Sequence, residues 1–94
     1  MKYIELIRLR TTGNYSDEIA QVLMETMDTN KTTVKHCDIH FFKNTPLKTD
    51  FLVLIVYHAD LIDPHGSRTG QKLCELLKKF GLINHTIWTE LYQN

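Results

Sequence analysis

The sequence predicts a small α+β domain whose elements follow the order β-α-β-β-α-β. Four segments have the length and composition of strands, and two others carry apolar residues at helical spacing. The chain length of 94 residues suits one domain with one core. We therefore expect a single domain over residues 1–94.

The first half of the chain is predicted to form a strand, a helix and a second strand. Residues 3–9 are rich in strand formers and stop at turn residues 11–14. Apolar side chains then recur at helical spacing from Ser16 to near Asn30, with two carboxylates in the first turn. Residues 33–42 alternate between apolar and polar side chains, which is typical of a strand with two unlike faces. The two faces carry Cys37, Ile39 and Phe41 on one side and His36, Asp38 and His40 on the other.

The second half is predicted to form a strand, a helix and a last strand. Residues 51–57 are an unbroken apolar run of strand length. After turn residues 63–66, Ser67 is placed to cap a helix, and residues 82–92 are strand-like. The helix carries an apolar stripe and ends in basic residues and a glycine, as the helix dipole and C-terminal capping favour. The stripe is Leu73, Leu76, Leu77 and Phe80, and the end is Lys78, Lys79 and Gly81.

This element order is that of the ferredoxin-like plan, in which two helices cover one face of a four-stranded antiparallel sheet of strand order 4-1-3-2. Each strand must then offer an apolar side to the helices. We expect this side to hold Ile4, Leu6, Cys37, Ile39, Phe41, Ile87 and Leu91. The opposite side would gather Tyr3, Glu5, His36, Asp38, His40, Trp88, Glu90 and Tyr92 as a polar and aromatic surface.

The third predicted strand does not fit a sheet with one solvated face. Residues 51–57 are apolar at both parities, so their outer side chains should also be covered. The simplest cover is a second copy of the chain related by two-fold symmetry. We therefore expect a homodimer that packs sheet against sheet.

Composition argues against some classes of partner and indicates a cellular compartment. Eleven basic residues balance eleven acidic ones without a basic stripe, which argues against a nucleic-acid partner. No apolar run approaches the ~20 residues of a membrane helix, and charges interrupt the N-terminal segment, so we expect a cytoplasmic protein that does not insert into a membrane. Cys37 and Cys74 form neither a disulfide framework nor a CxxC pair, and we expect two reduced cysteines in the core.

The element order, the length and the two-sided apolar segment 51–57 together resemble the dimeric α/β-barrel superfamily over the whole chain. The resemblance implies that two ferredoxin-like protomers pair through their sheets and enclose a ligand cavity. Members of the superfamily include cofactor-independent monooxygenases of the antibiotic-biosynthesis type. No catalytic motif of that group matches this sequence residue by residue, so the resemblance carries over no activity and implies no cofactor.

Several residues could line such a cavity. Acid–base chemistry would need a histidine or a carboxylate in a cleft, and aromatic side chains could either line an apolar pocket or fill the contact between protomers. For Tyr3, Trp88 and Tyr92, a position in the contact between protomers is favoured. The candidates for ligand contact are Glu5, His36, Asp38, His40, His58, Trp88 and Glu90.

The histidines of the second predicted strand could suggest a metal site. Along an extended strand, however, His36 and His40 lie roughly 13 Å apart and cannot both bind one ion. A site would need Asp38 with one neighbouring histidine and help from His58 or Glu5. We favour a polar cleft surface over this arrangement and predict no metal.

The start of the second helix is a candidate anion site. Free N–H groups at a helix N-terminus and an arginine in the first turn could hold a phosphate or a carboxylate, which makes Ser67 and Arg68 the candidates. Neither a GxxxxGK[ST] nor a GxGxxG pattern is present, so a plain capped turn is the favoured reading.

Two classes of function follow from this sequence. The first is a homodimer that binds a small organic ligand and could act as an enzyme without a cofactor. The second is a regulatory or structural interaction module without catalysis. An enclosed pocket with convergent polar groups would favour the first class, and a flat, filled contact surface would favour the second.

Overall fold

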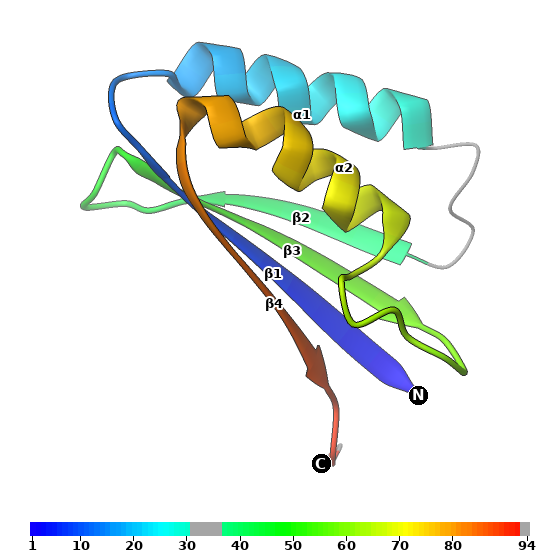
Figure 1. Ribbon diagram of the computed structural model, residues 1–94. Coiled ribbons are helices and arrows are strands. Elements are labelled where there is room, and N and C mark those ends of the chain that lie inside the picture. Colours follow the sequence, from blue (N-terminus) through cyan, green and yellow to red (C-terminus); the bar gives the residue numbers. More distant parts are fainter. Residues whose placement is uncertain (31–36, 93–94) are drawn as a thin grey trace.

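The structure is a computed structural model that describes residues 1–30 and 37–92 (Figure 1). Over these residues the chain forms four strands, two α-helices and one short 3₁₀ turn in the predicted order. The elements are β1 (Lys2–Thr11), α1 (Ser16–Asn30), β2 (Cys37–Lys43), β3 (Asp50–His58), α2 (Arg68–Leu77), the 3₁₀ turn Lys78–Phe80 and β4 (Gly81–Thr89).

The described strands form one antiparallel sheet of order β2-β3-β1-β4. Figure 1 shows α1 and α2 side by side on one face of this sheet, with the other face uncovered. The predicted βαββαβ ferredoxin-like fold and its 4-1-3-2 strand order are therefore confirmed.

The core lies between the sheet and the two helices. Its buried apolar side chains come from β1, β3, α1, α2 and the 3₁₀ turn, and each fully buried one contributes about 1.5–3 kcal/mol. Cys37, Ile39 and Phe41 of β2 pack against this core, as predicted. The buried cluster is Ile7, Leu9, Ile19, Leu23, Val53, Ile55, Leu73, Leu77 and Phe80.

The side chains of β1 face the opposite sides of the sheet from those predicted. Ile4 and Leu6 were expected beneath the helices, but the side chains buried there alternate through Tyr3, Glu5, Ile7 and Leu9. The phase is set by the second half of the strand. Ile7 and Leu9 enter the core only when the intervening arginines, Arg8 and Arg10, point away from it.

Helix α2 begins as predicted. The Ser67 side chain caps it by accepting a hydrogen bond from the Gly70 N–H at 3.0 Å. In the predicted apolar stripe Leu73, Leu77 and Phe80 are buried, whereas Leu76 is exposed. The α-helix ends at Leu77 and tightens into the 3₁₀ turn, after which β4 starts at Gly81 beside the backbone of β1.

Strand β4 is shorter than predicted. It ends at Thr89, which pairs with Tyr3, because β1 supplies a partner no further than Lys2, whose carbonyl accepts from the Glu90 N–H. Leu91 was expected to face the helices, and this prediction is wrong, since its side chain is 81% exposed.

Two further expectations concern the start of the second predicted strand and the absence of a membrane helix. Residues 33–36 of the predicted second strand, including His36, lie outside the described residues. No helix in the described ranges is long and apolar enough to cross a membrane.

Candidate functional site

The most unusual side chain of the protein is the carboxylate of Glu5. It has no exposed surface and lies on the helix side of β1, in contrast to the outward position predicted for it. Its Oε1 accepts a hydrogen bond from the Ser67 backbone N–H at 3.0 Å and lies 2.8 Å from Nε2 of His85 in β4. Burying a carboxylate is costly unless such partners are present.

Two glycines make room for this carboxylate. A β-carbon at Gly66 or at Gly70 would collide with Oε1 of Glu5, and Gly66 also has a φ of +98° that favours glycine. Glu5 therefore lies directly beneath the start of α2, where the free N–H groups and the helix dipole favour a negative charge.

The Glu5 carboxylate also faces the hydroxyl of Tyr57. Oε2 of Glu5 and the hydroxyl oxygen of Tyr57 are both buried, and a hydrogen bond between that hydroxyl and the Glu5 carboxylate contributes to the raised pKa of Tyr57. Burial raises the pKa of Tyr57 to about 12, and the nearby Glu5 carboxylate adds to this by disfavouring a second negative charge. Because an unsatisfied buried polar group costs about 1–3 kcal/mol, this contact offsets part of the cost of burying the carboxylate.

A pocket of about 390 Å³ adjoins this cluster. Tyr57, Gly66 and Ser67 form part of its wall and also surround Glu5, so the carboxylate lies directly behind that wall. Gln71 donates a hydrogen bond to the Gly66 carbonyl at 2.8 Å and holds the turn in place. We call this cavity the Tyr57 pocket; it is lined by Tyr57, Leu61, Ile62, Asp63, Gly66, Ser67, Arg68 and Gln71.

The two cysteines are not prepared for nucleophilic chemistry. Both are half-buried and unpaired. Burial raises the pKa of Cys37 to about 11 and raises that of Cys74 as well, with the charge of Glu5 as a second cause in each case. Both thiols are therefore protonated at neutral pH, and the thiolate is the reactive form.

The side of the sheet away from the helices forms a second candidate surface. Its centre is apolar and contains Ile4, Leu6 and Leu54, and it is flanked by Phe42 and Trp88, which are 48% and 55% exposed. We call this surface the open face; it consists of Ile4, Leu6, Arg8, Asp38, His40, Phe42, Leu52, Leu54, Val56, Asn84, Thr86 and Trp88.

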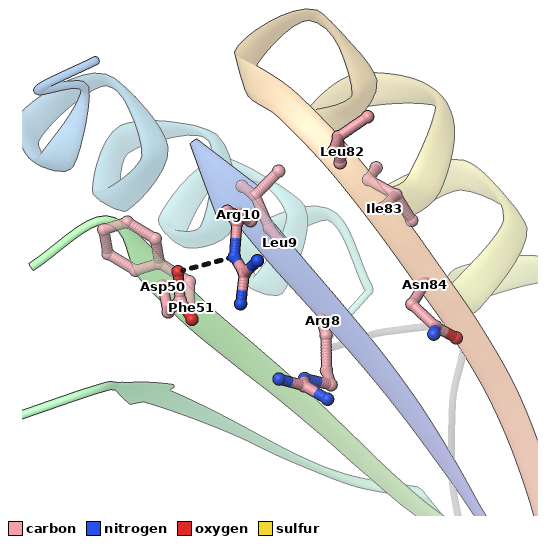
Figure 2. Close-up of a pocket in the computed structure, with 8 residues that line it drawn as sticks. All are labelled: Arg8, Leu9, Arg10, Asp50, Phe51, Leu82, Ile83 and Asn84. Carbon is pink, nitrogen blue, oxygen red and sulfur yellow. Dashed lines mark ion pairs between the residues drawn. The ribbon is translucent and has the colours of Figure 1, made fainter. Parts of the chain in front are cut away.

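One end of the open face is hollowed. Figure 2 shows this pocket, which has a volume of about 440 Å³ and lies between β3, β1 and β4. Arg10 pairs with Asp50 there, with 3.5 Å between Nε and Oδ1. Arg8 points into the same region and has no ion-pair partner within the described part of the chain.

The predicted ligand-contact residues fall into separate places. Asp38, His40 and Trp88 lie on the open face, and His58 is exposed at the end of β3. Glu90 follows β4 and pairs with Lys2, with 3.5 Å between the charged atoms. Glu5 was grouped with them but is on the other side of the sheet, and His36 lies outside the described residues.

The predicted anion site has an occupant from the chain itself. The Ser67 N–H binds the Glu5 carboxylate, and the Arg68 side chain is exposed at the rim of the Tyr57 pocket. As for metals, no group of three or more His, Cys, Asp or Glu side chains is arranged to hold an ion in the described residues.

Sequence reasoning did not identify His85 and Tyr57 as site residues. The strand pattern offered a signal for His85, which alternates with Ile83 and Ile87 and so lies on the inner face of β4. Tyr57 pairs with the buried Tyr3, and their ring centroids are 5.8 Å apart. Finding them required the phase of β1, which the sequence left ambiguous.

The comparisons with known proteins support the fold and no more. No protein-family model and no curated protein matches the sequence. Among solved structures, a point mutant of SnoaB from Streptomyces nogalater, a cofactor-independent oxygenase, superposes with a TM-score of 0.69 at 9% identity, covering 98% of this chain and 95% of that one. A candidate antibiotic biosynthesis monooxygenase from Nitrosomonas europaea gives 0.71 at 7% identity, covering 97% and 91%. Rv0793 from Mycobacterium tuberculosis gives 0.62 at 11% identity, covering 99% and 98%.

These likenesses confirm, at the level of the protomer fold, the resemblance to the dimeric α/β-barrel proteins that the whole-chain pattern predicted. Identities of 7–11% carry no residue role across.

Proposed function

We propose that the protein is a homodimer that pairs through its open face and binds a small organic ligand in the Tyr57 pocket of each protomer, without a bound cofactor. The observation that carries the proposal is the buried Glu5 carboxylate, held by Ser67 and His85 behind the wall of that pocket. The pocket combines apolar side chains with polar groups, as small-molecule sites do.

Catalysis in such a pocket would be acid–base chemistry. Glu5 and His85 share a short contact of 2.8 Å, and together they can accept and hold a proton. SnoaB, which has the same protomer fold, is a cofactor-independent oxygenase, and this supports an enzymatic reading by analogy of fold. The cysteines take no part in this proposal, because their thiols are protonated at neutral pH.

The dimer proposal rests on the open face. Its central side chains are apolar, and it carries two large exposed aromatic residues, Phe42 and Trp88. Arg8 lies towards one end of this face and Asp38 towards the other, and neither has an ion-pair partner among the described residues. A two-fold axis that brings opposite ends together would place unlike charges over one another, which favours a second copy as the partner.

We also propose a cytoplasmic location. Cys37 and Cys74 are unpaired, as thiols are in a reducing compartment.

The ligand proposal is tested by mapping binding onto the chain. Backbone amide NMR of the whole protein is recorded during titration with small neutral aromatic compounds. We expect the signals of Gly66, Ser67 and Gln71 to move, because these residues line the Tyr57 pocket. Ile62→Trp fills the pocket and should abolish the response, whereas Leu47→Trp, on the exposed loop before β3, should not.

The same titration separates the two classes of function. Shifts confined to the open face, with the Tyr57 pocket unaffected, would contradict the ligand proposal. Such a result would favour the alternative, a regulatory or structural interaction module whose open face contacts other proteins.

A further inference from the structure

Two charges of opposite sign stand unpaired on the open face. Arg8 of β1 and Asp38 of β2 are exposed on the side of the sheet that the helices leave uncovered (Figure 1). Neither side chain has an ion-pair partner in residues 1–30 and 37–92, whereas the neighbouring Arg10 is paired with Asp50 at 3.5 Å. One cation and one anion are thus left over on a surface whose centre is apolar.

The strand register places Leu54 midway between these two charges. Asp38 is paired with Val56 and Arg8 with Leu52, so the charges lie on opposite sides of β3 and four residues apart along it. Leu54 is halfway between Leu52 and Val56 and belongs to the same face. A two-fold axis that passes over Leu54, at right angles to the line joining the two charges, therefore exchanges their positions.

We propose that two copies of the chain pair about this axis, so that Arg8 of each protomer forms an ion pair with the partner's Asp38. This inference rests on the homodimer of the proposed function and adds the residues that fix its orientation. A two-fold contact is reciprocal, so one arrangement forms two equivalent ion pairs at once.

The same axis also brings apolar side chains together. In a flat sheet with strands about 4.8 Å apart and about 6.7 Å between alternate residues, the line from Leu54 to Trp88 is nearly at right angles to the line from Asp38 to Arg8. Leu54 and Trp88 therefore each meet the same residue of the partner. The indole N–H of Trp88 already donates to the Thr86 hydroxyl at 2.9 Å, so its ring can be covered without leaving that donor unpaired.

Other orientations of the axis leave the two charges unpaired. An axis parallel to the strands would place Arg8 over the partner's Leu52 and Asp38 over the partner's Trp88. An axis over Leu54 at right angles to the strands would place Arg8 over the partner's Ile4. Covering a charge with an apolar side chain costs free energy, and this favours the axis through Leu54 and Trp88.

Charge reversal tests this pairing in the whole protein. Arg8→Glu and Asp38→Lys each create two contacts between like charges, so we expect each variant alone to raise the dissociation constant of the dimer at least about tenfold in sedimentation experiments. An equimolar mixture of the two variants should form a heterodimer about as tight as the wild-type dimer, because both contacts then join unlike charges.

The control for net charge is Lys72→Glu. Lys72 is exposed on α2, on the opposite side of the sheet from the open face, and its reversal changes the net charge by the same amount as Arg8→Glu. This variant should dimerise as the wild type does. Mixed with Asp38→Lys it restores one ion pair instead of two, so its heterodimer should be the weaker one.

The outcomes separate this inference from the proposed function. If the wild type dimerises but the mixed variants remain monomeric, or if each variant alone dimerises as tightly as the wild type, the pairing is wrong while the dimer stands. A wild type that is monomeric at all concentrations overturns both. If a single variant does not fold, the chain that carries both reversals decides: we expect it to dimerise, and a monomer would overturn the inference.

Discussion

Glu5 is the residue on which the account depends. Its carboxylate is fully buried, but Oε1 is bound by the Ser67 N–H and by His85, so its removal takes the shared partner from two half-buried polar groups. We expect Glu5→Ala to lower the free energy of unfolding by about 2–4 kcal/mol, measured by urea denaturation. Glu5→Gln retains an acceptor and should cost less than half as much. Equal losses for the two variants would show that the hydrogen bonds to Oε1 contribute little.

The ionisation of Tyr57 makes the stability of the folded protein depend on pH in the alkaline range. Its pKa is raised from 10.0 to about 12 in the folded protein, mainly by burial, so between these values the folded state binds more protons than the unfolded state. The stability that this group contributes is therefore fully present below pH 10 and is lost as the pH rises towards 12.

The variant Tyr57→Phe checks this dependence. Urea denaturation at a series of pH values should show a shallower alkaline fall for Tyr57→Phe than for the wild type. Part of the fall should remain, since the pKa of Cys37 is also raised, from 9.0 to about 11. Superimposable profiles would mean that Tyr57 ionises as readily in the folded as in the unfolded protein.

At the scale of elements, the start of α2 is shaped around the carboxylate of β1. Gly70 lies in the first turn of α2, where alanine would ordinarily stabilise a helix by about 1 kcal/mol. Here a β-carbon would collide with Oε1 of Glu5, which Ser67 and His85 hold in place. We expect Gly70→Ala to destabilise the wild type by about 1–2 kcal/mol, because one of these hydrogen bonds is lost.

The control for this prediction is the same change without the carboxylate. In the Glu5→Ala background, Gly70→Ala should be neutral or stabilising, and the double-mutant cycle should show a coupling above about 1 kcal/mol. Additive effects of the two substitutions would contradict the proposed steric conflict.

The elements also show what the sequence could and could not predict. The order of the elements and the capping of α2 by Ser67 follow from local patterns, and both were predictable. The phase of β1 was not, because Ile4 and Leu6 on one parity compete with Ile7 and Leu9 on the other. The choice depends on which set packs against the helices. Arg8 and Arg10 favour burial of Ile7 and Leu9, because the two arginines then lie on the exposed side.

The site was less predictable than the fold for a related reason. The partners of Glu5, namely Gly66, Ser67, Gly70 and His85, lie about 60 to 80 residues further along the chain. Their approach depends on the path of the loop before α2, which no local pattern determines. Placing Ile4 and Leu6 beneath the helices put Glu5 on the outward parity, and with Glu5 on the wrong face its partners could not be identified.

At the scale of the whole molecule, the open face predicts the oligomeric state. Leu54 lies at its centre, between Leu6 of β1 and His40 of β2. Sedimentation of the wild type should give about twice the chain mass of 11.0 kDa, and Leu54→Lys should give the monomer, because it buries a charge in the contact.

The matched control for this substitution is Met24→Lys on α1. Met24 is 64% exposed on the helical side, away from the proposed contact, and its replacement should leave the dimer intact. A wild type that sediments as a monomer at all concentrations would contradict the dimer proposal. It would have no bearing on ligand binding in the Tyr57 pocket.

The most direct test of the central claim is a crystal structure of the wild-type protein grown with phenol. The account predicts two protomers joined through their open faces, with phenol in each Tyr57 pocket. Phenol bound only on the open face, with the Tyr57 pocket empty or filled by water, would contradict it.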